Sequence, residues 1–431
     1  MLTPGGAFEP HKSRQRKPEK PHARARLFTN ALSLCYTDAK KGGGGVKRAG
    51  GILLLCLLLA AAFSVVAGAG EPAEISIISA NISGLPAVFS KYDRDVPASQ
   101  KTLGRMLSES GYDIVCVQED FGYHDIFAAE MDNYPYRTFT TGGVPVGDGV
   151  NIFSVYPIYN VERVAWTAAH GIFADGSDSL CPKGFIRCTV DVGGVLIELY
   201  NMHMDAYHTE GDQLAKKAQL EQLAAYIAAN AGDRPVLITG DMNLTFHKDP
   251  LAEGYRILVA QSGFADAWIE YKNGGNYMQG KDGEALIAYW YEKFGGHDWG
   301  RWDSVERVFY RGGDGLTFTP ARFEYVVYSD DPSDKKALTD HRMMECVLRL
   351  DLDGYARPAD LKLEPPAPPG ALATGLRALA MTCRFVGILL YGGALWLWQN
   401  HPVALGLSFA LPCALIALCL YRKKKKRRKA A

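Results

Sequence analysis

The stretch from Pro235 to Asn243 places polar side chains directly after an apolar run. Its apolar and β-branched residues predict a buried strand, and Gly240 permits a sharp turn of the backbone. Asp241 and Asn243 are two residues apart, so their side chains fall on the same side of an extended chain. Metal-assisted attack on phosphate uses such a pair, because one group handles a proton or a metal and the other donates a hydrogen bond to a charged oxygen. An ordinary Asx turn is the alternative for this motif taken alone.

Polar residues also lie beside other apolar runs of the chain. Asn81, Glu119 and His203 each come at the end of such a run, and the pair Asp340-His341 follows Leu338-Thr339. A turn, a solvated side chain or a cap explains each of them alone, but together they supply hard oxygen ligands and two imidazoles. This combination suits a divalent cation and proton transfer. The runs that we expect to be strands are 75–80, 113–117, 149–154, 185–190, 195–200, 236–239, 323–328 and 344–350.

Two helices are predicted between these strands. Residues 99–110 have apolar side chains at helical spacing and end before Gly111, and residues 211–229 form a longer amphipathic pattern. Strands outnumber helices, and the segment 71–365 is long enough for one large α/β domain. The pattern therefore predicts two packed sheets that are flanked by helices.

An ordered set of motifs extends over residues 75–350. It comprises Asn81-x-x-Gly84, Gln118-Glu119, Gly149 with Phe153-Ser154 and Pro157-Ile158, Asn201-x-His203, Gly240-Asp-x-Asn243, Asp266-Ala-Trp268 and Thr339-Asp-His341. In this order the motifs resemble the endonuclease/exonuclease/phosphatase superfamily. Within it the chain looks most like neutral sphingomyelinases, on the features Asn81-Ile-Ser-Gly-Leu-Pro86, Lys183-Gly184, His203-Met-Asp205-Ala206, Phe264-Ala-Asp-Ala-Trp268 and the hydrophobic segments after the domain.

The resemblance implies a four-layer α/β sandwich, in which two packed mixed sheets are flanked by helices. It also implies a metal-dependent phosphoric diester hydrolase that uses Mg²⁺. Glu119 would hold the metal, Asn81 would lie beside it, and Asp340 would support the metal site. Mg²⁺ prefers one or two carboxylates together with waters and substrate phosphate oxygens, which this set allows.

The resemblance further implies the catalytic roles. His341 would be the general base that takes a proton from the attacking water. His203 and Asn243 would donate hydrogen bonds to the phosphoryl oxygens as negative charge grows on them, and Asp241 would orient water or metal-bound groups. Hydrolysis would be in line, without a covalent intermediate on the enzyme.

The chain departs from the family at the partner of this base. The family has an Asp a few residues before an aromatic strand, and that Asp pairs with the base histidine. Here Glu306 fits the spacing, with a longer side chain, and Asp303 lies three residues earlier. Glu306 is therefore the candidate partner of His341, with its placement left open.

The charge of the chain is divided unevenly. The whole chain is formally neutral, but residues 71–365 hold 44 acidic and 26 basic residues, which is a net charge of −18. Such a domain is a poor general binder of nucleic acid, because phosphate contacts need Lys and Arg. A phospholipid in a membrane is the leading substrate class, with sphingomyelin as the lead candidate and a monomer as the expected state. A surface or secreted nuclease, an inositol-phosphate phosphatase and a non-enzymatic scaffold are the alternatives.

An aromatic-rich stretch precedes Glu306. A core subdomain explains it as well as a surface for a lipid interface, where amphipathic rings settle, and the rings could also surround a choline ammonium. The aromatic residues are Trp268, Tyr271, Tyr277, Tyr289, Trp290, Tyr291, Phe294, Trp299 and Trp302.

The two ends of the chain differ from the domain in composition. Residues 1–45 predict a disordered basic extension, with the working start near Val46, and residues 46–70 predict a signal peptide or an N-terminal anchor. The predicted catalytic domain is 71–352, followed by a Pro-rich linker at 353–375, hydrophobic membrane segments within 376–421 and a basic tail at 422–431.

The location of the domain depends on these ends. The two candidate spans are 376–398 and 403–421, and a basic tail stays on the cytoplasmic side of a membrane. A membrane-attached protein with an extracytoplasmic catalytic domain is favoured by the signal peptide, whereas a cytoplasmic domain with a C-terminal hairpin is the alternative. Cysteine adds little, because Cys116 and Cys346 lie in apolar runs and the pairing of Cys181 with Cys188 is left open.

Overall fold

The structure is a computed structural model that describes residues 74–87, 94–172, 178–244, 253–275, 277, 281, 285, 288, 305–328 and 338–400. The chain divides into two units between Glu71 and Pro72, and all described residues belong to the second unit. The predicted extension at 1–45, the predicted signal peptide or anchor at 46–70, the second candidate span and the basic tail lie outside the described residues, as does Asp303.

The first sheet has six strands in the order β11-β12-β1-β2-β4-β3. Its central pair, β1 and β2, is parallel, whereas β12 and β4 pair antiparallel on either side. The strands are β1 (Glu74–Asn81), β2 (Ile114–Gln118), β3 (Tyr136–Arg137), β4 (Asn151–Ser154), β11 (Leu316–Val326) and β12 (Met343–Leu352).

The second sheet repeats this plan in the order β5-β6-β7-β8-β10-β9. Here β7 and β8 form the parallel pair, with β6 and β10 antiparallel beside them. The strands are β5 (Ile158–Ala165), β6 (Gly184–Val192), β7 (Val195–His203), β8 (Val236–Asp241), β9 (Ala265–Asp266) and β10 (Glu306–Arg311). Both sheets are mixed, as predicted.

The sheet topology explains how distant residues meet. Parallel neighbours end at the same edge, so Asn81 lies opposite Gln118 in the first sheet and His203 lies opposite Asp241 in the second. An antiparallel neighbour begins where these strands end. Glu306, the first residue of β10, therefore pairs with Asp241, and β12 begins beside the end of β1.

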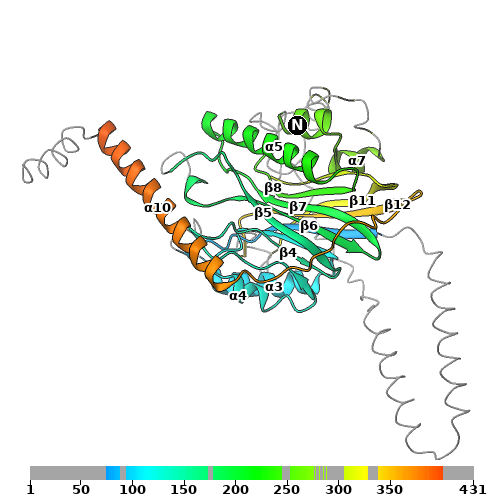
Figure 1. Cartoon of the computed structure of the whole chain (residues 1–431), viewed down its shortest axis with the longest axis horizontal. Helices are drawn as coiled ribbons and strands as arrows, with labels where there is room; N and C mark the ends of the chain where they lie inside the picture. Colours follow the sequence, from blue (N-terminus) through cyan, green and yellow to red (C-terminus); the bar gives the residue numbers. More distant parts are fainter. Residues whose placement is uncertain are drawn as a thin grey trace, which may run out of the picture. The chain divides into compact units, whose positions relative to one another are not determined.

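Helices cover the outer faces of the two sheets (Figure 1). On one side, α5 (Glu210–Asn230) packs Leu220 and Leu223 into the core that the second sheet shares with the first. On the other side, Leu103 and Leu107 of α3 (Val96–Glu109) pack against the first sheet, near the short α4 (His124–Ala128). The other described helices are the 3-10 helix η2 (Asp178–Leu180), the π-helix η4 (Tyr255–Gln261), α7 (Ala267–Asn273) and α10 (Ala371–Asn400).

The predicted architecture of two packed mixed sheets with helices is confirmed. Every predicted strand has a counterpart, and the predicted helices at 99–110 and 211–229 correspond to α3 and α5. The structure also has β3, β5, β9 and β10, which are not among the predicted runs. Of these, β5 is an edge strand, and its half-exposed polar residues hide its pattern. The strand predicted at 323–328 extends back to Leu316 through a register shift between Pro320 and Arg322.

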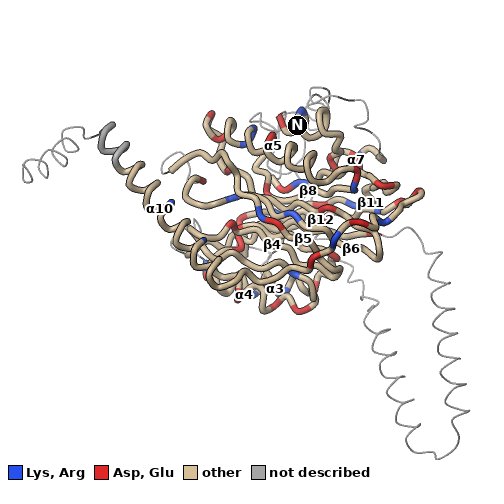
Figure 2. The backbone as a smooth tube through the Cα atoms, viewed as in Figure 1, with Lys and Arg blue, Asp and Glu red and all other residues tan. Residues whose placement is uncertain are grey.

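One described helix is long and apolar enough to cross a membrane. It is the part of α10 from Ala371 to Gly393, 23 residues with a mean hydropathy of 1.4, and length and composition are the only basis for the assignment. Figure 2 shows how few charges this helix carries, and Arg377 and Arg384 are the basic residues in its sequence. The first predicted span, 376–398, lies entirely within α10, which begins at Ala371, inside the segment predicted as the linker.

Candidate active site

The side chain of Asn81 joins the two sheets at the edge where their parallel strands end. Asn81 Nδ2 donates to Glu119 Oε1 at 3.1 Å and to Asp241 Oδ2 at 3.0 Å. Its Oδ1 accepts a hydrogen bond from the Ser83 backbone N–H at 3.0 Å. Asn81 and Asp241 are buried, and Glu119 is half-buried, so this contact places two carboxylates at one inner corner of the domain.

His341 lies at the same corner and is paired with Glu306. Its Nδ1 is 2.8 Å from Glu306 Oε1 and 3.8 Å from Asp241 Oδ2. The ring is partly exposed, whereas both carboxylates are buried. The longer side chain of Glu306 thus reaches the imidazole, and ligand atoms of Asp241, Glu306 and His341 lie within 4.8 Å of one another, close enough to share a metal ion.

His203 and Asn243 complete the group on the β7–β8 side. His203 Nε2 is 3.5 Å from Asp241 Oδ2, and within the described part of the chain its buried Nδ1 has no hydrogen-bond partner. Asn243 donates from Nδ2 to the Met204 carbonyl at 3.2 Å, and its backbone N–H donates to Asp241 Oδ1 at 3.1 Å. Asn243 Nδ2 therefore keeps one N–H for another acceptor.

Two of these residues have a backbone conformation that side chains rarely adopt. Glu119 has a φ of 56° and Asn243 has a φ of 51°, both in the left-handed region. Within β8, Gly240 pairs with Met202 of β7 and has a φ of 133°, and a Cβ there would lie 2.1 Å from the Met202 carbonyl oxygen. Local strain of this kind persists where the surrounding structure enforces it, and it gathers at functional sites.

Burial dominates the electrostatics of the site. It raises the pKa of Glu119 and of Asp241, while the positive charge of His341 acts in the opposite direction on both. Burial alone would lower the pKa of His341, but the carboxylates around it, Glu306 foremost, outweigh this effect and raise that pKa to about 10. Burial and the nearby Lys183 hold the pKa of His203 well below its usual value, so His203 is neutral.

Asp340 lies apart from this hydrogen-bonded group. Its side chain is exposed, and among the described residues no hydrogen bond or ion pair joins it to the others. Its negative charge nevertheless acts on Glu119, whose pKa it helps to raise. The structure thus brings together Asn81, Glu119, His203, Asp241, Asn243, Glu306 and His341, with Asp340 at their edge.

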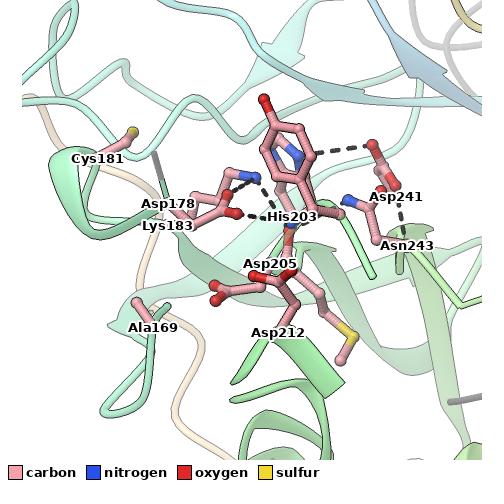
Figure 3. A network of polar contacts seen from close by, with 12 residues as sticks. Ala169, Asp178, Cys181, Lys183, His203, Asp205, Asp212, Asp241 and Asn243 are labelled. Carbon is pink, nitrogen blue, oxygen red and sulfur yellow. Dashed lines mark hydrogen bonds and ion pairs between the residues drawn. The ribbon is translucent and has the colours of Figure 1, made fainter. Parts of the chain in front are cut away.

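A lysine beside the site has no role in the sequence-based assignment. Lys183 Nζ is 2.5 Å from Asp178 Oδ1 and donates to the Met204 carbonyl at 3.1 Å (Figure 3). Burial opposes its charge, but the adjacent Asp178 raises the pKa of Lys183. The sequence does contain a hint of this residue, because Lys183 stands directly before a predicted strand. Sequence alone does not show that the Lys183 side chain turns toward His203.

Three further carboxylates gather behind this lysine. Ligand atoms of Asp178, Asp205 and Asp212 lie within 4.8 Å of one another, and all three residues are buried. Each is already engaged: Asp205 accepts from the His170 N–H and from Gln219, and Asp212 caps the start of α5 through Thr209. Burial and the neighbouring Asp178 raise the pKa of Asp205 to about 6.

Asn201 links the sheets directly behind the site. From β7 its Nδ2 donates to the Val117 and Asn151 carbonyls, each at 3.0 Å, and its Oδ1 accepts from Gln118 Nε2 at 2.6 Å. Asn201 and His203 lie two residues apart on one face of β7, and Gln118 precedes Glu119. Both belong to the sequence motifs, but the cross-sheet contact follows only from the packing.

Other predicted features have a structural explanation. Trp268 is buried, Tyr271 and Tyr277 pack against the core, and Asp266 caps the start of α7, so the described part of the aromatic stretch belongs to the core. The remaining aromatic residues, from Tyr289 to Trp302, lie outside the described residues. Cys181 and Cys188 are free thiols in the structure, as are Cys116 and Cys346.

The chain is similar to several known proteins. A sphingomyelinase of Mycobacterium tuberculosis is 27% identical over 284 residues, which is 62% of this chain and 51% of that protein. This chain therefore spans about half the length of the curated relatives it matches. Among solved structures, sphingomyelinase C of Streptomyces griseocarneus is 19% identical, with a TM-score of 0.43, and covers 64% of this chain and 99% of its own. A Staphylococcus aureus beta toxin with bound magnesium ions is 16% identical, with a TM-score of 0.44 and the same two coverages.

The family assignment rests on a longer match. The model of the endonuclease/exonuclease/phosphatase family matches residues 78–341, which is more than half of the chain. The match runs from β1 to the histidine before β12 and includes every strand end that contributes to the site. The resemblance predicted from the motifs is confirmed: the chain belongs to the endonuclease/exonuclease/phosphatase family.

Proposed function

We propose that this protein is a Mg²⁺-dependent phosphodiesterase that hydrolyses the headgroup bond of a phospholipid, in the manner of a sphingomyelinase. The observation that carries the proposal is the contact of Asn81 with both Glu119 and Asp241, 3.0–3.1 Å long, beside the Glu306–His341 pair. Carboxylates, an amide and a carboxylate-held imidazole then surround one point, which is what hydrolysis of a phosphate ester requires.

Glu119 and Asn81 would hold the metal, and Asp340 would support it from the edge. The donor set fits, because buried carboxylates whose pKa is raised by burial gain from a nearby divalent cation, and oxygen ligands suit Mg²⁺. Asn81 presents its nitrogen to the carboxylates, so it would serve as a ligand only with the amide oxygen and nitrogen exchanged. When bound, the ion would polarise a phosphoryl oxygen and neutralise charge that develops there.

His341 would accept the proton of the attacking water at Nε2, because its Nδ1 is occupied by Glu306 at 2.8 Å. The carboxylates that raise the pKa of His341 to about 10 would be partly neutralised by a bound divalent cation, which would leave the ring free to act as a base. The carboxylate of Glu306 orients the ring and stabilises the imidazolium that forms. As the water oxygen bonds to phosphorus, the opposite phosphorus–oxygen bond to the lipid would break, and the leaving alkoxide would take up a proton from solvent. No group of the protein would be bonded to phosphorus at any stage. Asp241, which is close to both imidazoles, would orient the water.

His203 and Asn243 would donate hydrogen bonds to the phosphoryl oxygens. Burial and Lys183 keep His203 neutral, and a neutral imidazole has one N–H group that can donate a hydrogen bond. Asn243 has one amide N–H that is free of the Met204 carbonyl. Both are fixed before substrate arrives, and preorganised donors of this kind stabilise the negative charge of the transition state.

A phospholipid is the substrate class that the sequence and the relatives favour. The net charge of −18 across residues 71–365 opposes a duplex-binding groove, and curated relatives are named sphingomyelinases. A surface or secreted nuclease and an inositol-phosphate phosphatase use the same catalytic groups and stay as the second candidates. We propose a monomer.

We also propose that α10 attaches the protein to a membrane, with the catalytic domain outside the cytoplasm. An apolar 23-residue segment and its mean hydropathy of 1.4 support attachment. Extraction of membranes with alkaline carbonate tests it: an integral protein stays in the membrane pellet. Release of the full chain into the supernatant would contradict attachment through α10.

One assay separates the substrate classes. The purified full chain is incubated with sphingomyelin, phosphatidylcholine, phosphoinositides or plasmid DNA, each with Mg²⁺ or with EDTA. We expect Mg²⁺-dependent release of the headgroup from sphingomyelin, and loss of turnover in a folded His341→Ala variant. Cleavage of DNA without cleavage of lipid would replace the lipid proposal by the nuclease, and the absence of any Mg²⁺-dependent turnover would favour a scaffold.

A further inference from the structure

A lysine inside α5 is buried without a carboxylate partner. Lys216 is 0% exposed and lies on the buried stripe of the helix with Asp212, Gln219 and Leu223. Throughout the described residues no carboxylate comes within ion-pair distance of its ammonium. Two backbone carbonyls receive it instead: Lys216 Nζ donates to Tyr207 O at 2.5 Å and to Asn243 O at 2.9 Å.

Both carbonyls belong to residues in the left-handed region of the backbone. Tyr207 has a φ of 59° and Asn243 has a φ of 51°. This conformation is a genuine outlier for a bulky aromatic residue and is tolerated better by Asn. The two residues lie in the loops that follow β7 and β8, the parallel strands that end at His203 and Asp241. One ammonium therefore joins the two loops that border the site.

We propose that Lys216 is a positioning residue for the proposed phosphodiesterase reaction. It holds the loop after β8 against α5 and against the loop after β7, so that the Asn243 amide stays aimed at the phosphoryl group. Lys216 is not itself a catalytic residue, since its donors are directed at backbone oxygens. The inference rests on the proposed function, because it assigns the support of a residue whose role belongs to that proposal.

The choice of lysine at this position is informative. Burial lowers the pKa of Lys216 to about 8, which shows that the folded protein disfavours its charge. An apolar side chain of similar length would avoid this penalty, but it would leave the Tyr207 and Asn243 carbonyls without their donor. A neutral amine still has two N–H donors, so both carbonyls stay satisfied whether or not the group is protonated. Lysine therefore suits a geometric role better than a stabilising one.

The experiment replaces Lys216 by Met in the full chain. The adjacent Lys217→Met is the matched control, because the Lys217 side chain is 46% exposed and its Nζ is 3.7 Å from Glu253. Turnover is measured on sphingomyelin in mixed micelles and on bis(4-nitrophenyl) phosphate. A small displacement of a catalytic group costs about 100-fold in rate, so we expect kcat of Lys216→Met to fall by about that factor. KM and the Mg²⁺ concentration for half-maximal rate should match those of Lys217→Met.

A double-mutant cycle shows whether the effect acts through Asn243. In an Asn243→Ala background, Lys216→Met should lower kcat by less than about threefold, since the positioned amide is already absent. The full loss in that background would overturn the inference, and so would a Lys216→Met enzyme as active as Lys217→Met. If Lys216→Met does not fold, Lys216→Gln enters the same cycle with the same two criteria. A wild-type chain without phosphodiesterase activity would instead remove the proposed function itself.

Discussion

Asn81 Nδ2 and Asp241 Oδ2 lie 3.0 Å apart, although the two residues are 160 positions apart in the chain and belong to different sheets. The same nitrogen is 3.1 Å from Glu119 Oε1. Packing of the two sheets, with Asn201 holding them together behind the site, therefore decides whether the carboxylates face one another. The candidate active site is a property of the interface between the sheets, and four predictions follow from its contacts.

Glu119→Gln should weaken the dependence on Mg²⁺. The substitution keeps the size of the side chain but removes the negative charge that is proposed to hold the ion, so the Mg²⁺ concentration for half-maximal rate should rise by about tenfold or more. This concentration is measured by titrating turnover with Mg²⁺ after EDTA has removed the metal. Asp125→Asn, an exposed carboxylate on α4, is the control and should titrate like the wild type. An unchanged Mg²⁺ response in Glu119→Gln would remove Glu119 from the metal site.

Glu306→Gln should lower kcat by about 100-fold or more, with KM little changed, because His341 loses the carboxylate that orients it and stabilises its protonated form. The kcat of Glu306→Asp should lie between that of Glu306→Gln and that of the wild type. The shorter Asp side chain retains the negative charge but does not reach as far as the present 2.8 Å contact. Steady-state kinetics of both variants measure the effect, with the exposed Glu324→Gln as control. Equal kcat in Glu306→Gln and wild type would exclude the Glu306–His341 pair from catalysis.

Gly240→Ala should destabilise the domain by about 3 kcal/mol or more, because a Cβ at a φ of 133° adds backbone strain and would stand 2.1 Å from the Met202 carbonyl oxygen. Urea unfolding followed by circular dichroism measures the loss. Gly122→Ala serves as control, since a Cβ there meets no atom within 4 Å. A variant as stable as Gly122→Ala would show that β7 and β8 can separate at this point.

Lys216 should make the stability of the protein rise with pH in the alkaline range. The folded pKa is about 8 and the usual value is 10.5, so between these values the unfolded chain binds more protons and stability increases with pH. From pH 7.5 to 9.5 the wild type should gain about 2 kcal/mol relative to Lys216→Met. Unfolding by urea at both pH values gives this difference, in which the titration of other groups cancels. A difference of zero would show that Lys216 is solvated in the folded state.

Much of this protein could be predicted from local patterns. A run of apolar residues before a turn predicts the strand from Val236 to Asp241, and apolar residues at helical spacing before Gly111 predict α3. Both patterns can be recognised in the sequence because they depend only on residues that are close together in the chain. The candidate site residues were predicted in the same way, as polar residues at the ends of apolar runs. Their order also identified the family.

Tertiary structure decided what those residues contact. No local rule shows that Glu306 reaches His341, that Lys183 turns toward His203, or that Lys216 spans two loops, because each contact joins segments whose distance depends on sheet pairing and on the packing of one sheet against the other. A buried lysine in an amphipathic helix and an exposed one beside it look alike in sequence. Sequence thus determined which chemical groups stand at the strand ends, and only the folded chain determined which of them contact one another or the same backbone carbonyl.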